Sequence, residues 1–206
     1  MIRVAAILLV AGRSTRFSAA PEATQTKLVA PLAGKPLARY AAEAALASSA
    51  DLVIAVTGHA RADVEAALEG LALRWVHNAR FADGLASSLQ HGLAAAPDDV
   101  DGAVILLGDM PAVTPGLIEQ LIAAFKAKPD ALAVAPVHDG QRGNPILLAR
   151  ELFAAVAGLD GDIGARRLLD ASPRERILEI PVEGFETRLD IDTREALTAA
   201  TRTLKF

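Results

Sequence analysis

Short, largely apolar runs alternate along this chain with longer segments that have helical apolar spacing. The short runs predict strands at residues 2–10, 51–57, 73–77, 102–107 and 131–137. The longer segments predict helices at residues 36–48, 60–69, 85–96 and 114–127. Strands that are apolar throughout are typical of a parallel sheet buried on both faces. The alternation therefore predicts an α/β fold, a Rossmann-like three-layer α/β/α sandwich with a mostly parallel sheet.

Length and charge narrow the classes of protein further. The chain has 206 residues, which suits a single domain over 1–206. A net charge of −4 gives no basic field for nucleic acid, so no nucleic-acid partner is expected. The absence of cysteine excludes disulfides, thiolate metal sites and cysteine nucleophiles. The apolar N-terminal run is too short to span a bilayer and no clean cleavage region follows it, so we expect a soluble cytoplasmic protein without a membrane partner.

Positive charge and a glycine gather where the first strand ends, in the segment "LVAGRSTRF". Gly12 allows close approach of the backbone to a ligand, and the N–H groups after it can hold phosphate oxygens. Arg13, Arg16 and Lys27, the last placed after a polar loop at 19–26, can neutralise a triphosphate. The segment is neither a Walker A loop nor a GxGxxG fingerprint. The alternative is an ordinary turn with solvated cations.

Carboxylates follow two further segments. Asp109 comes directly after the strand at 102–107, where it can bind Mg²⁺ or serve as a turn residue. Asp190 and Asp192 alternate on an extended stretch, so their side chains should point to opposite faces. We therefore expect one of them to face a metal and the other to cap the helix that begins near Thr193.

Two more regions carry polar groups at loop positions. One, at a loop-to-helix junction, can contact a nucleotide base or simply cap a helix; its residues are Asn78, Gly84, Ser87 and Ser88. The other consists of two glycine-rich turns, at 139–148 and 161–169, which suit a second-substrate pocket or ordinary turns.

Together these segments resemble the MobA-like NTP transferases that act on the molybdenum cofactor, and most closely the molybdenum cofactor cytidylyltransferase (MocA) branch. The first matching motif, L-x-A-G-x-S-x-R-F…K-L, runs from Leu9 to Leu28. The others, in chain order, are N-x-x-F-x-x-G-L-x-S-S-L from Asn78, L-G-D-M-P from Leu107, G-x-x-G-N-P from Gly140, G-D-x-G-A-R from Gly161 and D-I-D-T from Asp190.

The resemblance implies a nucleotide-diphospho-sugar transferase-like fold and a role for each motif. Catalytic roles fall on Arg16, Lys27 and Asp109. Nucleotide contacts fall on Leu9, Ala11, Gly12, Arg13, Ser14, Arg16, Lys27, Asn78, Gly84, Ser87 and Ser88. Acceptor contacts fall on Gly143, Asn144, Pro145, Gly164 and Arg166, and metal binding on Asp109 and Asp192. Residues 1–110 would mainly bind nucleotide, and residues 111–206 mainly the acceptor.

The reaction implied by the resemblance is Mg²⁺-dependent transfer of CMP from CTP to molybdopterin with release of pyrophosphate; Mn²⁺ could replace Mg²⁺. A molybdoenzyme or its maturation chaperone would be a further partner. The related guanylyl-transferring branch typically has two glycines where this chain has Ala11–Gly12, so the resemblance favours CTP over GTP. Three alternatives stay open: another nucleotide such as GTP, another acceptor such as a sugar phosphate, and a non-catalytic carrier of nucleotide or cofactor. A nicotinamide dehydrogenase is disfavoured, since both GxGxxG and an acidic residue ending the second strand are missing.

Overall fold

The structure is a computed structural model, and it describes residues 1–17, 26–162, 164–183, 187 and 189–203. The loop expected at 19–26 lies outside the described residues except for Thr26. No helix in the described part of the chain combines the length and apolar character that crossing a bilayer requires.

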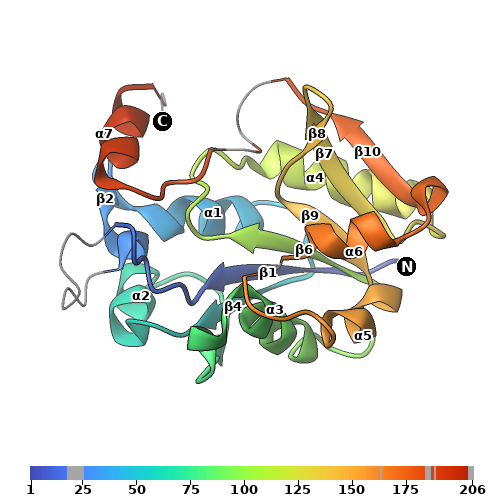
Figure 1. The fold of residues 1–206 in the computed structure, drawn as a ribbon, viewed down its shortest axis with the longest axis horizontal. Helices are drawn as coiled ribbons and strands as arrows, with labels where there is room; N and C mark the ends of the chain where they lie inside the picture. The colour runs from blue at the N-terminus through green and yellow to red at the C-terminus, as the bar shows by residue number, and fades with distance from the viewer. Residues whose placement is uncertain (18–25, 163, 184–186, 188, 204–206) are drawn as a thin grey trace.

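A single large sheet forms the centre of the molecule (Figure 1). Its strand order is β10-β7-β9-β6-β1-β4-β5, and the short β8 pairs with β7. The strands are β1 (Val4–Val10), β4 (Leu52–Thr57), β5 (Arg74–His77), β6 (Gly102–Leu107), β7 (Ala133–His138), β8 (Gln141–Arg142), β9 (Ile146–Ala149) and β10 (Ile177–Pro181). A separate small ribbon pairs β2 (Pro31–Leu32) with β3 (Lys35–Pro36).

Most of the pairs in the large sheet are parallel, as predicted. β1 lies between β4 and β6 and is parallel to both, with Leu9 beside Val56 on one side and Leu107 on the other. β4–β5 and β7–β10 are also parallel. β9 is antiparallel to both of its neighbours, β6 and β7. The sheet is therefore mostly parallel, with one antiparallel strand inserted between its two parallel parts.

Helices cover both faces of this sheet, so the molecule has three layers. The α-helices are α1 (Leu37–Leu46), α2 (Arg61–Ala67), α3 (Leu85–Ala94), α4 (Pro115–Ala127), α5 (Phe153–Val156), α6 (Arg166–Ala171) and α7 (Arg194–Thr203). Short 3₁₀ turns are η1 (Lys27–Val29), η2 (Phe81–Asp83), η3 (Arg150–Leu152) and η4 (Arg174–Arg176). In the view of Figure 1, α1 and α4 lie above the sheet, and α3 and α5 lie below it.

The side chains of β1 show why this strand is apolar at every position. Val4, Ala6, Leu8 and Val10 join one core with residues of α1 and α4. Ala5, Ile7 and Leu9 join the second core with residues of α3, α5 and α6. A strand buried on both faces has no position left for a polar side chain. A third, smaller cluster joins Phe17 to Ile191 and to Ala200 of α7.

Candidate active site

The fold places a cleft where the strand order reverses. The chain lays down β1, β4 and β5 in one direction across the sheet and then returns to β6 on the other side of β1. In open α/β sheets, ligands bind at such a switch point, beyond the carboxyl ends of the strands. A cleft of about 620 Å³ lies there. The predicted site residues that line this cleft are Leu9, Ala11, Gly12, Arg13, Ser14, Arg16, Lys27, Gly84, Ser88, Asp109 and Asp192.

Lys27 is the electrostatic centre of the cleft. Its Nζ lies 2.6 Å from Oδ2 of Asp109 and 2.7 Å from Oδ1 of Asp192. Arg16 Nη1 donates to the other oxygen of Asp192 at 2.8 Å. The Lys27 side chain is 11% exposed. Burial by itself would lower the pKa of Lys27, but the two carboxylates outweigh it, so this pKa is raised above its usual 10.5. The hydrogen bond from Lys27 lowers the pKa of Asp192 despite its partial burial.

Hydroxyl groups fix Lys27 in place. Ser14, which has a φ of 55°, shares a hydrogen bond of 3.0 Å with the hydroxyl of the fully buried Thr26. The Ser14 hydroxyl also accepts a hydrogen bond from the Lys27 backbone N–H at 3.1 Å. Thr26 in turn caps η1 by accepting from the backbone N–H of Leu28. The Ser14 side chain thus connects the segment after β1 to Thr26 and to the backbone of Lys27.

Asp109 offers an unused oxygen. Its Oδ1 is buried and has no hydrogen-bond partner among the described residues, whereas its Oδ2 pairs with Lys27. A buried carboxylate oxygen without a partner is costly unless a ligand or ion completes it. Asp109, Asp190 and Asp192 all line the cleft, and carboxylate oxygens are the ligands that Mg²⁺ and Mn²⁺ favour. The donor set therefore fits a divalent cation.

The expectation for Asp190 and Asp192 was wrong in one respect. Both residues line the same cleft, and Asp192 is the one whose carboxylate contacts Lys27 and Arg16. The alternation argument requires a strand, and this segment has no regular secondary structure. Nor does either aspartate cap α7: Ala196 N–H donates to the hydroxyl of Thr193 at 3.1 Å.

Asn78 and Ser87 lie behind the wall of the cleft. Asn78 is fully buried, and its amide nitrogen donates to the hydroxyls of Ser87 and Ser88 at 3.1 Å each. Its amide oxygen accepts from the Arg80 backbone N–H at 2.8 Å. Of these residues, only Ser88 lines the cleft. The arrangement makes Asn78 a positioning residue for the segment from Gly84 to Ser88.

Gly84 allows two distant loops to touch. It has a φ of 100°, and a Cβ built on it would lie 2.4 Å from the backbone of Gly161. The Gly161 carbonyl accepts a hydrogen bond from Ala86 N–H at 3.0 Å. The later glycine-rich turn therefore packs directly on the segment that precedes α3. The contact also brings Asp162 into the lining of the cleft.

A smaller cavity of about 260 Å³ adjoins this cleft and brings together three of the predicted acceptor residues, Asn144, Gly164 and Arg166. Its floor is apolar, and it shares Leu9, Leu85 and Leu107 with the cleft. Gly143 and Pro145 are buried beside it and do not line it. Gly143 packs against Thr187, whose carbonyl accepts from Asn144 N–H at 3.0 Å.

Some residues that support or line the site were not singled out in the sequence analysis. Thr26 and Thr187 act through hydrogen bonds to neighbouring backbone, and isolated threonines give no signal of such a role. Asp162 was visible as the second letter of the G-D-x-G-A-R motif, but was read only as part of a turn.

The fold and the cleft define a nucleotidyltransferase domain with the fold of nucleotide-diphospho-sugar transferases. The sequence pattern of the MobA-like NTP transferase domain matches residues 6–177, and the chain belongs to this family.

The chain is also similar in sequence to two bacterial proteins. Purine catabolism protein PucB of Bacillus subtilis is 32% identical over 197 residues, which cover 92% of this chain and 91% of PucB. The bifunctional protein GlmU of Halorhodospira halophila is 36% identical over 120 residues, or 58% of this chain. That match spans 24% of GlmU, so the chain corresponds to about a quarter of this relative's length.

Solved structures extend the likeness over nearly the whole chain. The crystal structure of Rv0371c from Mycobacterium tuberculosis H37Rv superimposes with a TM-score of 0.83 at 25% identity, covering 98% of this chain and 99% of that one. A second crystal structure of Rv0371c, a complex with manganese, gives a TM-score of 0.78 at 25% identity and covers 98% and 100% of the two chains.

Proposed function

We propose that this protein transfers the CMP moiety of CTP to molybdopterin and releases pyrophosphate. The observation that carries the proposal is the pairing of two adjoining cavities. One is a cleft at the switch point, where cations of the first loop and Lys27 lie beside carboxylates; the other is a smaller cavity with an apolar floor, lined by Asn144 and Arg166. A triphosphate that carries a divalent cation suits the first, and a flat ring system suits the second. Residues 1–110 would mainly bind nucleotide and residues 111–206 the acceptor.

Cations of the first loop would hold the triphosphate. Arg13 and Arg16 line the cleft and are exposed, so they can reach phosphate oxygens without loss of core packing. The backbone around Gly12 is open, and no atom lies within 4 Å of a Cβ built there, so a phosphate can approach it closely. Lys27 would exchange its carboxylate partners for phosphate oxygens as the nucleotide binds.

A divalent cation would be held by Asp109 and Asp192. The partnerless Oδ1 of Asp109 supports this assignment, as does the manganese complex of Rv0371c. No group of three or more His, Asp and Glu side chains converges on one point in the described part of the chain. Phosphate oxygens and water would therefore complete the coordination, which is usual for Mg²⁺. When bound, the cation would neutralise charge on the phosphates.

The transfer itself needs positioning more than acid–base chemistry. A terminal phosphate oxygen of the acceptor would attack the α-phosphorus of CTP, and the bond from that phosphorus to the β-phosphate bridge would break. The acceptor phosphate is already anionic near neutral pH, so no side chain has to remove a proton. Lys27 and Arg16 would stabilise the charge that grows on the departing pyrophosphate.

The test is pyrophosphate release by the purified protein with Mg²⁺, molybdenum-loaded molybdopterin and each of CTP, GTP, ATP and UTP. Release that requires molybdopterin and is fastest with CTP supports the proposal. Preference for GTP would keep the chemistry and refute the nucleotide assignment. Release with a sugar phosphate but not with molybdopterin would refute the acceptor. Tight nucleotide binding without any release would indicate a carrier.

Asp109→Asn and Asp83→Asn make a matched pair for this assay. The first removes the carboxylate that contacts Lys27, and release should fall by at least about a hundredfold. Asp83 pairs with Arg80 outside the cleft, so Asp83→Asn should keep wild-type release. If Asp109→Asn retained full Mg²⁺-dependent turnover, the assignment of Asp109 would be wrong.

A further inference from the structure

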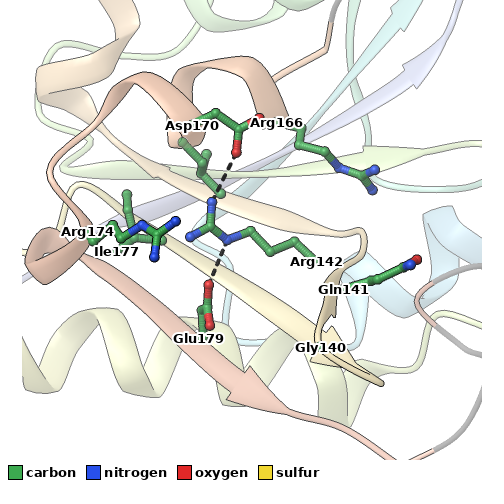
Figure 2. Close-up of a pocket in the computed structure, with 9 residues that line it drawn as sticks. Gly140, Gln141, Arg142, Arg166, Asp170, Arg174, Ile177 and Glu179 are labelled. Atoms are coloured by element: carbon green, nitrogen blue, oxygen red, sulfur yellow. Dashed lines mark hydrogen bonds and ion pairs between the residues drawn. The ribbon is translucent and has the colours of Figure 1, made fainter.

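A third cavity, of about 840 Å³, lies between β8, α6 and β10 (Figure 2). Arg142, Arg166 and Arg174 line it together with Asp170 and Glu179, and we call it the arginine cavity. Its arginines outnumber its carboxylates, although the chain as a whole carries a net charge of −4. Only Arg166 among these residues also belongs to the site described above.

Arg142 is the fixed element of the arginine cavity. Its Nε donates to Glu179 at 2.8 Å and its Nη1 to Asp170 at 3.2 Å, and its side chain is 19% exposed. The hairpin turn before it has positive φ at both Asp139 and Gly140, which is typical of the tight turns that set strand register. The guanidinium has five N–H donors. Those not used by Glu179 and Asp170 make no hydrogen bond with the described residues.

Arg174 supplies a second guanidinium without a carboxylate. It comes from η4, it is exposed, and it forms no ion pair with a described residue. In Figure 2 its guanidinium points toward that of Arg142. Glu179 and Asp170 already offset the charge of Arg142, whereas neither Arg174 nor Arg166 forms an ion pair with a described residue. Their planar N–H donors match the oxygens of phosphate and related oxyanions.

The arginine cavity continues the acceptor site. Arg166 lines it and also lines the smaller cavity that contains Asn144, and that cavity shares Leu9 and Leu85 with the nucleotide cleft. A molecule that starts in the cleft and crosses the apolar floor would meet Arg166, the residue shared with the arginine cavity, and would have Arg142 and Arg174 beyond it.

We propose that the arginine cavity binds an oxyanion at the end of the acceptor remote from the phosphate that attacks the nucleotide. The inference rests on the proposed function for the direction in which the acceptor lies. It deepens that function by naming an acceptor class: molecules with a reactive phosphate at one end and a second oxyanion at the other. Arg142 and Arg174 bind this second group, and Asp170 and Glu179 hold Arg142 in place.

The first experiment measures binding without turnover. Inorganic phosphate is titrated calorimetrically into the wild-type protein, Arg174→Gln and Arg167→Gln. Arg167 is an exposed arginine of α6 that lines none of the three cavities, so it is the matched control. Phosphate can also bind in the nucleotide cleft, and this binding should be the same in all three proteins. Arg174→Gln should weaken or remove one class of site by about tenfold or more, which is the usual effect of a charge-assisted hydrogen bond.

The second experiment identifies the source of the oxyanion through the KM for the acceptor. Molybdenum-loaded molybdopterin carries oxo groups on the metal in addition to its phosphate, and metal-free molybdopterin does not. Arg174→Gln should raise the KM for the loaded form about tenfold, and should change the KM for the metal-free form and for CTP much less. Arg167→Gln should match the wild type throughout.

Two results would overturn the inference. Phosphate binding that is the same in all three proteins would show that the arginine cavity holds no anion. Weaker phosphate binding by Arg174→Gln with an unchanged KM for both acceptors would assign the cavity to a free anion instead. A failure of the proposed function looks different, because pyrophosphate release would then be absent or would not require molybdopterin, while the phosphate titration would still report on Arg174.

Discussion

Replacing Lys27 with methionine tests the electrostatic core of the cleft. Methionine is close to lysine in length, so the packing of this buried side chain should survive. The positive charge is lost, however, and two carboxylates that now share Nζ of Lys27 are left facing each other. Both carboxylate oxygens lie within 2.7 Å of that nitrogen, so they can be no further apart than twice that distance.

The expected loss of stability can be worked out from the separation between the two carboxylate oxygens. Two unit charges about 5 Å apart repel by about 3 kcal/mol at an effective dielectric constant of about 20. Asp192 is 37% exposed, so solvent screening reduces the figure, and we expect Lys27→Met to lower the free energy of unfolding by about 2 kcal/mol at pH 7. Lys35 pairs with Glu43 at the surface, and Lys35→Met should cost less than about 1 kcal/mol.

The free energy of unfolding that Lys27→Met loses should depend on pH and on divalent cations. In the wild type, the lowered pKa of Asp192 adds stability above its usual 3.8, which is lost as pH falls through the folded-state value. The raised pKa of Lys27 adds stability that is lost only as pH rises beyond 10.5. The difference between wild type and Lys27→Met should therefore be largest near neutrality. It should shrink as pH falls below 3.8 through the lowered pKa of Asp192, because protonation of Asp192 removes its ion pair with Lys27.

Urea denaturation at pH 7 and at about pH 3, with and without Mg²⁺, measures these differences. Mg²⁺ should restore stability to Lys27→Met, since it supplies the missing positive charge between the carboxylates. The double variant Lys27→Met/Asp109→Asn removes one of the two negative charges, and it should be more stable than Lys27→Met alone. The reasoning is refuted if Lys27→Met is as stable as wild type at pH 7, or if the double variant loses further stability.

Other predictions test the scaffold around the cleft. Asn78→Ala should lower the free energy of unfolding by about 1–3 kcal/mol, since it strips partners from two buried serine hydroxyls, and urea denaturation measures this. Gly84→Ala would place a Cβ 2.4 Å from the Gly161 backbone at a φ of 100°, so both melting temperature and pyrophosphate release should fall. Thr193→Ala removes the hydroxyl that caps α7 and should cost about 1 kcal/mol; Thr193→Ser should restore it.

The centre of the fold was predictable because burial on both faces leaves a clear pattern. β1, β4, β6 and β7 were recognised from runs in which nearly every residue is apolar. α4 was recognised from the helical apolar spacing at 114–127, and in the structure the Thr114 hydroxyl caps this helix, which has Pro115 at its first position.

The edges of the fold were not predictable in the same way. β9 has four residues, too few to separate it from part of a helix, and nothing local shows that it runs against its neighbours. β10 lies at the edge of the sheet and is partly exposed, so it lacks the continuous apolar run of a central strand.

The residues of the candidate site can also be divided into those that the sequence predicts and those that it does not. Gly12 and Asp109 could be found because they follow buried parallel strands, and the ends of such strands meet at one edge of the sheet. The pair between Lys27 and Asp192 joins residues 165 positions apart, and spacing carries no information about it. Asn78 was expected to contact nucleotide, yet its burial and its hydrogen bonds to two serines direct it into the scaffold.

The segment from Thr187 to Asp192 explains how the later part of the chain completes a site built on β1 and β6. The Thr187 carbonyl accepts from Asn144 N–H, Ile191 N–H donates to the Asp109 carbonyl at 3.0 Å, and Asp192 pairs with Lys27. Residues of one stretch of chain thus contact Asn144, Asp109 and Lys27 in succession. Its described residues, 187 and 189–192, have no regular secondary structure, so these contacts and the packing of Ile191 hold them in position. A change that loosens this segment should therefore weaken nucleotide and acceptor binding together, although neither ligand needs to touch its backbone.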